Sequence, residues 1–255
     1  MLSYYEFGEK DLAPVVIVHG LYGSGRNWGV IAKRLSDTYR VYTVDQRNHG
    51  LSPRTSTHSY PEMAEDLGEL IAHLGGPVQL IGHSMGGKTA MTLALTQPEL
   101  VRRMVVADIA PVAYRHSQLP YIHAMRSVDL SRVTRRSDAE AQLAAQGVEP
   151  ALCSFFTQSL DVQEKRWRLN LDTLEQDMDK IVGFPDLSGR FEGATLFLSG
   201  ANSDYVQPDH RNTIKGFFPN AHFAKLKDAG HWLHAEQPRA FEAALRGFLA
   251  TSERS

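Results

Sequence analysis

One serine in this chain of 255 residues stands where it could act as a nucleophile. Ser84 is the centre of Gly82-His-Ser-Met-Gly86, which fits the pattern G-x-S-x-G. The apolar residues 78–81 lead directly into this pattern, and the helix-forming residues 85–95 lead directly out of it. Such an order is typical of a nucleophile elbow, in which the serine hydroxyl projects above a sheet and the flanking glycines leave room for the turn. We therefore expect Ser84 to attack an acyl carbonyl.

A serine hydroxyl is a weak nucleophile until a base takes its proton, so a histidine from elsewhere in the chain is required. The chain contains eleven histidines. In proteins with such an elbow the histidine comes after the last strand, and only His231 and His234 satisfy that order. His231 follows Gly230 in a loop just past the expected strand 221–226, whereas His234 lies in a helix-like approach to Pro238. We predict that His231 is the base.

A second motif could stabilise the oxyanion that forms when the serine attacks. His19-Gly-Leu-Tyr-Gly-Ser24 follows the apolar run 15–18, and a loop in that place supplies one backbone N–H to the oxyanion hole. We assign this N–H to Leu21. The second N–H is assigned to Met85 at the start of the helix, where the helix dipole also favours negative charge. A plain glycine-rich turn is the alternative explanation of the loop.

The elements that must hold these residues alternate between short β-branched runs and longer helical patterns, which indicates an α/β fold with a mostly parallel sheet. Strands are expected at 15–18, 39–44, 78–81, 103–107, 194–199 and 221–226, and helices at 27–35, 61–74, 85–97 and 238–250.

The segment from about 112 to 189 breaks this alternation. It shows several helical patterns, one opening with the expected capping box Ser137-Asp-Ala-Glu140, and no convincing strand. We therefore expect a core domain, residues 1–110 and 191–255, with a helical cap, residues 111–190. The cap should lie over the carboxyl ends of the strands, where open α/β sheets bind ligands.

Composition argues against several other classes of function. Lys and Arg number 27 against 29 Asp and Glu, so the net charge of -2 provides no field for nucleic acid. The single cysteine, Cys153, cannot form an internal disulfide or a thiolate cage, and no histidine pair has the helical spacing of a zinc site. We expect no metal and no cofactor.

The N-terminal residues are acidic where a signal peptide needs a basic start, and the longest aliphatic run, 15–18, is far shorter than the ~20 residues that span a bilayer. We therefore expect a cytoplasmic protein without a membrane span.

Six segments, spread over nearly the whole chain, can be compared with a known family: His19-Gly-Leu-Tyr-Gly-Ser24, Asp45-Gln-Arg-Asn-His-Gly-Leu-Ser52, Gly82-His-Ser-Met-Gly-Gly-Lys88, Asp108-Ile-Ala-Pro111, Gly200-Ala-Asn-Ser203 and Gly230-His-Trp-Leu-His-Ala-Glu236. In these segments the chain resembles the bacterial esterase family related to the mitochondrial α/β-hydrolase-domain-containing esterases. Lys88 after the elbow, and Asn48 where many relatives have glycine, indicate this branch in particular. The resemblance implies the α/β-hydrolase fold and the hydrolysis of acyl esters and acyl thioesters without a metal or an organic cofactor.

Two aspartates compete to be the acid that orients His231. In most α/β-hydrolases this acid follows the strand that corresponds to 194–199, and Ser203 occupies that position here, with Asp204 one residue out of register. Asp108 ends the preceding strand and resembles the family's alternative acid position, so we predict Asp108. If Asp108 instead caps the first helix of the insertion, Asp204 is the acid.

The expected function is a serine-dependent hydrolase of carboxylic esters or acyl thioesters, acting through an acyl-enzyme, with a small-molecule substrate as its partner. Phe155, Phe156 and Trp167 would shape its pocket, unless they form the core of the cap. Two other classes stay open. A cofactor-free perhydrolase or a C–C bond hydrolase could use the same triad, and a non-catalytic sensor of small molecules could keep the pocket alone.

Overall fold

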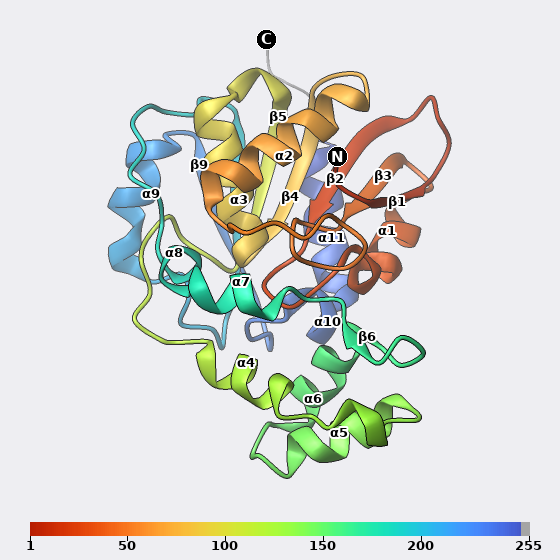
Figure 1. Cartoon of the computed structure of the whole chain (residues 1–255). Coiled ribbons are helices and arrows are strands. Elements are labelled where there is room, and N and C mark those ends of the chain that lie inside the picture. Colours follow the sequence, from red (N-terminus) through yellow and green to blue (C-terminus); the bar gives the residue numbers. More distant parts are fainter. Residues whose placement is uncertain (251–255) are drawn as a thin grey trace.

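A seven-stranded sheet forms the centre of the computed structural model, which describes residues 1–250 (Figure 1). Only the first strand runs antiparallel to its neighbour, and the other strands are mutually parallel. Across the sheet the order is β1 (Tyr4–Phe7), β3 (Tyr39–Val44), β2 (Ala13–Val18), β4 (Val78–His83), β5 (Val101–Ala107), β8 (Ala194–Gly200) and β9 (Ala221–Leu226). The α/β fold and the mostly parallel sheet predicted from the sequence are confirmed.

All six predicted strands are present, and β3 and β9 have the predicted bounds. The prediction missed β1, which has four residues, is only partly buried and lies at the edge of the sheet. Its ladder with β3, from Tyr4 opposite Val44 to Phe7 opposite Val41, is what makes this segment a strand. The pattern of residues 4–7 alone gives no information about their pairing with β3.

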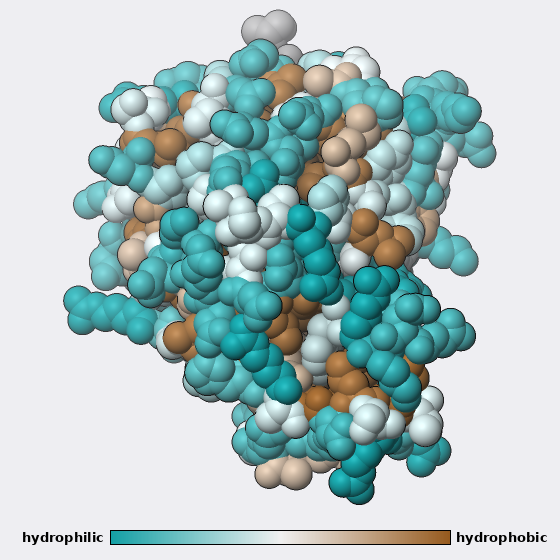
Figure 2. All heavy atoms as spheres, in the orientation of Figure 1, coloured by the Kyte–Doolittle hydropathy of each residue, from teal (hydrophilic) through white to brown (hydrophobic). Residues whose placement is uncertain are grey.

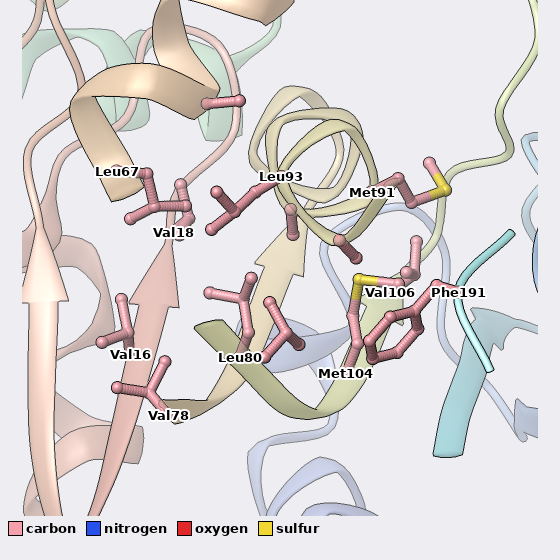
Figure 3. Close-up of a cluster of buried hydrophobic side chains, with 14 of the residues drawn as sticks. Val16, Val18, Leu67, Val78, Leu80, Met91, Leu93, Met104, Val106 and Phe191 are labelled. Carbon is pink, nitrogen blue, oxygen red and sulfur yellow. The ribbon is translucent and has the colours of Figure 1, made fainter. Parts of the chain in front are cut away.

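Three helices pack on one face of the sheet: α2 (Tyr60–His73), α3 (Met85–Thr96) and α9 (Arg211–Phe217). Figure 3 shows Leu67 of α2 and Leu93 of α3 packed over Val16 and Val18 of β2 and Leu80 of β4. All these side chains are almost fully buried, and burying each large aliphatic side chain stabilises the fold by roughly 1.5–3 kcal/mol. This packing holds α3 against the sheet and so fixes the position of its first residue, Met85.

Helices α1 (Gly29–Leu35) and α11 (Pro238–Leu249) cover the other face. Ile31 of α1 and Phe241 of α11 belong to the buried cluster that includes Val15 and Ile17 of β2. The sequence pattern placed the first of these helices at 27–35, but residues Gly25–Trp28 form a 3₁₀ turn and α1 begins at Gly29.

The chain between β5 and β8 forms a helical insertion. It holds α4 (Leu119–Arg126), α5 (Arg136–Ala144), α6 (Pro150–Thr157), α7 (Leu171–Gln176), α8 (Met178–Val182) and a 3₁₀ turn at Leu130–Arg132. In Figure 1 it lies below the carboxyl ends of the strands. A separate buried cluster, which includes Leu143, Phe156 and Trp167, holds it together and also contacts Tyr22 and Met85 of the sheet region. The division into a core, 1–110 and 191–255, and a cap, 111–190, stays a prediction.

Two sequence predictions for the insertion are wrong. It does contain strands, the pair β6 (Leu160–Asp161) and β7 (Arg166–Trp167), which are too short to leave a periodic pattern. The capping box at Ser137 is also absent, because α5 begins at Arg136 and the carboxylate of Asp138 accepts from the N–H groups of Thr134 and Arg135. The N-cap is therefore Arg135, two residues earlier than the pattern indicated.

The remaining short elements are α10 (Leu233–Glu236) and 3₁₀ turns at Pro98–Leu100 and Pro208–His210. Within the part of the chain that the structure describes, no helix has the length and apolar character needed to cross a bilayer.

Candidate active site

Ser84 is the single residue between the end of β4 and the start of α3, and its backbone conformation is strained. Its φ of 52° and ψ of -121° lie outside the regions that a side chain with a Cβ readily adopts. A Cβ on Gly82 would overlap the carbonyl oxygen of Gly86, and a Cβ on Gly86 would overlap that of Val18. The turn is this tight because β2, β4 and α3 meet here, and it directs the Ser84 side chain into a cavity above the sheet.

His231 lies in the loop between β9 and α10, and its ring joins Ser84 to Asp108. Its Nε2 is 3.1 Å from Ser84 Oγ, and its Nδ1 is 2.7 Å from Asp108 Oδ2. The ionised carboxylate can only accept, so Nδ1 carries the hydrogen and Nε2 is free to accept the proton of the Ser84 hydroxyl. The three residues thus form a chain in which a proton can leave the serine.

Asp108 follows β5 directly and is fully buried. Besides His231, its carboxylate accepts from the backbone N–H of Gly200 at 3.0 Å and from the hydroxyl of Ser203 at 2.5 Å. Asp204, the competing candidate, is exposed, and within residues 1–250 its carboxylate accepts only from the Gln207 side chain, at 3.3 Å. The structure therefore brings Asp108 to His231 and leaves Asp204 away from it.

Two further side chains hold His231 in place. The ring of Tyr205 stacks on the His231 ring with centroids 4.0 Å apart and planes 19° apart. His83, directly before Ser84, donates from Nε2 to the carbonyl oxygen of His231 at 2.8 Å. Burial lowers the pKa of His83 well below 6.5, so its ring stays neutral. The sequence gave no signal for the contact of either side chain with His231.

Backbone N–H groups without a protein acceptor flank the serine. Within residues 1–250, neither Leu21 nor Met85 donates its N–H to a protein atom, and both residues line the cavity at Ser84. The loop of Leu21 is held by His19, whose Nδ1 donates to the Gly20 carbonyl at 2.8 Å and whose Nε2 accepts from the Gln46 N–H at 3.0 Å. Burial lowers the pKa of His19 to about 4, which keeps its ring in the neutral form that can do both.

The cavity beside Ser84 has a volume of about 240 Å³ and a mostly aromatic and aliphatic lining. The insertion supplies Phe155 and Phe156 to this lining, whereas Trp167 packs only in the buried cluster of the insertion, so both alternatives that the sequence left open occur among these aromatics. In Figure 2 hydrophobic surface gathers where the insertion, at the bottom of the view, meets the body of the molecule. Within residues 1–250, no group of three or more His, Cys, Asp or Glu side chains is arranged to hold a metal ion.

Lys88, one helical turn after Ser84 on α3, is a buried cation at the cavity wall. Its Nζ donates to the carbonyl oxygens of Val182, at 3.0 Å, and Gly183, and lies 4.8 Å from the centroid of the Tyr114 ring. Burial lowers the pKa of Lys88 to about 7. Lys88 thus ties α3 to the end of α8, a role that the sequence did not indicate.

Comparison with known proteins gives one matching family and many relatives. A family described as "alpha/beta hydrolase fold" matches residues 13–238. The chain is 42% identical to the "sn-1-specific diacylglycerol lipase ABHD11" of Mus musculus, covering 95% of this chain and 83% of that protein. It is 36% identical to "Esterase YbfF" of Escherichia coli (strain K12), covering 94% of each.

A solved structure described as "Marine microorganism esterase" superimposes on the chain with a TM-score of 0.92. The two share 39% sequence identity, and the match covers 97% of this chain and 98% of the other. The similarity therefore includes both the sheet and the insertion.

Proposed function

The chain belongs to the α/β-hydrolase family and is a carboxylic ester hydrolase, and from this premise we propose that it works through an acyl-enzyme on Ser84. In this proposal Ser84 is the nucleophile, His231 is the general base and Asp108 is the acid that orients His231. The backbone N–H groups of Leu21 and Met85 form the oxyanion hole.

The first half of the reaction transfers the acyl group to the enzyme. His231 Nε2 takes the proton of Ser84 as Oγ attacks the carbonyl carbon, and the carbonyl oxygen becomes an oxyanion held by the two N–H groups. When the tetrahedral intermediate collapses, the bond to the leaving alcohol or thiol breaks. His231 gives that group its proton, which leaves the acyl chain esterified to Ser84.

The second half returns the enzyme to its starting state. His231 removes a proton from a water molecule, which attacks the acyl-enzyme and forms a second oxyanion in the same place. Collapse of this intermediate breaks the bond to Ser84 Oγ, which regains its proton from His231. Asp108 keeps the imidazole in the required tautomer and stabilises the imidazolium in both halves.

One observation carries this proposal: an unbroken line of contacts from Ser84 Oγ through both ring nitrogens of His231 to Asp108, at 3.1 and 2.7 Å. Both distances lie within the reach that proton transfer needs. The unpartnered N–H groups beside Ser84 give further support, because donors already in place cost no reorganisation during reaction.

For the substrate we propose small acyl esters or acyl thioesters. The relatives named esterase and diacylglycerol lipase support an ester, and the apolar lining of the cavity suits a hydrocarbon acyl chain. The thioester follows from the mechanism, because a thiol leaves as readily from the same intermediate and needs no additional residue.

The test is a panel of nitrophenyl esters and acyl thioesters of graded chain length, run on the protein and on Ser84→Ala. We expect Ser84→Ala to lower kcat by several orders of magnitude on every substrate, with the fold kept. A rapid burst of nitrophenol from the unaltered protein would report the acyl-enzyme. Equal turnover by the protein and by Ser84→Ala would disprove the proposal, and no turnover by either would favour a non-catalytic sensor.

A second arm compares Asp108→Asn with Asp204→Asn. We expect Asp108→Asn to lower kcat about 10⁴-fold, because a neutral amide favours the wrong tautomer of the histidine. The exposed Asp204 serves as the matched control and should leave kcat within twofold of the unaltered protein. The reverse ranking would assign the acid to Asp204.

A further inference from the structure

A second cavity, with a volume of about 430 Å³, lies over β8 and over β9, the last strand of the sheet (Figure 1). Phe197 of β8 lies opposite Phe223 of β9, and two residues further on Ser199 lies opposite Lys225. Side chains two residues apart on a strand point to the same face, so these four project together into the second cavity. None of its lining residues also lines the cavity beside Ser84, so the two cavities are separate.

Ser199 presents a buried hydroxyl to the second cavity. The residue is only 3% exposed, yet its Oγ has no hydrogen-bond partner among residues 1–250. Buried polar side chains in folded proteins are nearly always hydrogen-bonded. An unpaired hydroxyl that faces a cavity therefore points to a polar group on a ligand.

Two cations border the second cavity, and no acidic residue among residues 1–250 lines it. Arg211, the first residue of α9, and Lys225 both belong to the lining. Neither side chain takes part in an ion pair within the described chain. The Arg211 guanidinium lies 4.7 Å from the centroid of the Phe223 ring, which places its charge beside the apolar part of the lining. The second cavity thus combines positive charge, a hydroxyl and an aromatic surface.

We propose that the second cavity is a ligand site and that its ligand is a carboxylate with an attached hydrocarbon or aromatic chain. The carboxylate accepts hydrogen bonds from Arg211, Lys225 and Ser199, and the chain covers Phe197 and Phe223. A volume of about 430 Å³ and a mostly apolar lining with a few polar groups are typical of small-molecule sites. This inference goes beyond the proposed function and does not depend on it.

Both parts of the ligand are required by the lining. Arg211 and Lys225 are exposed, and an exposed ion pair contributes little by itself because water and salt screen it. An apolar chain without a polar head would leave the Ser199 hydroxyl unpaired, which is costly for a buried group. A phosphate ion would present only polar oxygens to the phenylalanine rings. A carboxylate with an apolar chain matches the charge, the hydroxyl and the rings together.

The test is an NMR titration of the protein with hexanoate, which carries both parts. The amide signals of residues 223–225 report the second cavity, and those of Ser84 and His231 report the other cavity, so binding at each is measured separately. We expect the signals of residues 223–225 to shift and saturate. Acetate, which lacks the chain, and hexan-1-ol, which lacks the charge, should each bind there at least about fivefold more weakly. Shifts confined to Ser84 and His231, or equal binding of hexan-1-ol and hexanoate at residues 223–225, would overturn the proposal.

Neutral variants test the two cations. Arg211→Gln combined with Lys225→Gln should raise the Kd for hexanoate, measured at residues 223–225, at least about fivefold. Lys33→Gln combined with Arg239→Gln is the matched control, because it removes the same charge from exposed residues outside the second cavity. This control should leave the Kd within about twofold of the unaltered protein. Equal Kd values in the two double variants would contradict the assignment of the carboxylate to Arg211 and Lys225.

Ser199→Ala tests the hydroxyl separately. We expect it to raise the Kd for hexanoate at least about threefold, because the carboxylate loses one donor. Ser36→Ala is the matched control, since it also removes one hydroxyl, outside the second cavity. An unchanged Kd in Ser199→Ala would remove the buried hydroxyl from the site and with it the proposal. The titrations require no turnover, so failure of the acyl-enzyme mechanism at Ser84 would leave their outcome unaffected.

Discussion

Lys88 is a buried amine whose protonation state changes near neutral pH. Its ammonium group is held by two carbonyl oxygens and the face of Tyr114, and no carboxylate within residues 1–250 forms an ion pair with it. Removing the charge from water lowers the pKa of Lys88 from 10.5 to about 7 in the folded chain.

This lowered pKa predicts that folding stability rises with pH above 7. Between pH 7 and 10.5 the unfolded chain holds a proton at Lys88 that the folded chain has mostly released, so the contribution is lost as the pH falls through about 7. Urea unfolding at pH 7.5 and 9.0 should show a gain of about 1–2 kcal/mol that Lys88→Met lacks. The exposed Lys33→Met is the control, and an equal gain in Lys88→Met would contradict the assignment.

The sequence identified those residues of the site that belong to a recognisable local motif. Ser84 lies in a short pattern between a strand and a helix. The order along the chain reduces eleven histidines to His231 and His234, and the loop after Gly230 selects His231. The contacts of Ser203, Tyr205 and His83 join segments that are distant in the chain, so no local pattern contains them. The choice between Asp108 and Asp204 stayed open in the sequence for the same reason.

At the scale of elements, the elbow depends on the close approach of three backbones. A methyl group on Gly86 would meet the carbonyl oxygens of Val18 and His19 in β2 and the loop after it. Backbone cannot move aside as a flexible side chain can, so α3 would have to shift away from the sheet.

We therefore predict that Gly86→Ala destabilises the fold by at least about 1–3 kcal/mol and lowers kcat more than tenfold. Gly247→Ala is the matched control. Gly247 lies within α11 with no atom near its added Cβ, so the same substitution should stabilise the protein by about 0.5–1 kcal/mol. Thermal unfolding and ester hydrolysis measure both effects. Similar melting temperatures for the two variants would refute the argument from close packing.

Elements with a strong internal pattern were predicted, and those that depend on a partner were not. The apolar runs of β2, β3 and β4 are buried on both faces, which leaves an unmistakable pattern in the sequence. Strands β1, β6 and β7 have two to four residues and exist because another strand pairs with them. The N-cap of α5 lies two residues earlier than predicted, because the acid that accepts from the N-cap N–H is Asp138 and the N-cap is Arg135.

At the scale of the whole molecule, several histidines are buried in the neutral form. Burial lowers the pKa to about 4 for His19 and to about 3 for His49 and His234, and the pKa values of His58 and His83 also lie well below 6.5. Each of these rings binds a proton in the unfolded chain more readily than in the folded one.

The contribution of these histidines to stability should therefore be complete above pH 6.5 and be lost as the pH falls towards 4. Between pH 6.5 and 5.5 each such histidine lowers the free energy of unfolding by about 1 kcal/mol. His234→Phe should reduce this acid sensitivity by that amount, since His234 stacks on Trp28 and its buried Nδ1 has no hydrogen-bond partner among residues 1–250. Urea unfolding at pH 6.5 and 5.5 tests this, with the exposed His73→Phe as control. Unchanged acid sensitivity in His234→Phe would contradict it.

The alternation of strands and helices was enough to predict the α/β class and the parallel sheet, because parallel neighbours require long connections. The shape of the insertion was not predictable in the same way. Its helices are short, and its buried cluster joins residues from Ile122 to Ile181 whose contacts no single window of sequence contains.

The insertion occupies the connection between β5 and β8, which are direct neighbours in the sheet. Every parallel pair needs some crossover, and the ladder between these two strands fixes their register whatever the crossover contains. Lengthening such a connection costs little, about 0.6 kcal/mol per doubling. We therefore expect that the insertion can be replaced as one contiguous segment without disturbing the sheet. Such a replacement should change which substrates fit the cavity and leave Ser84, Asp108 and His231 in place.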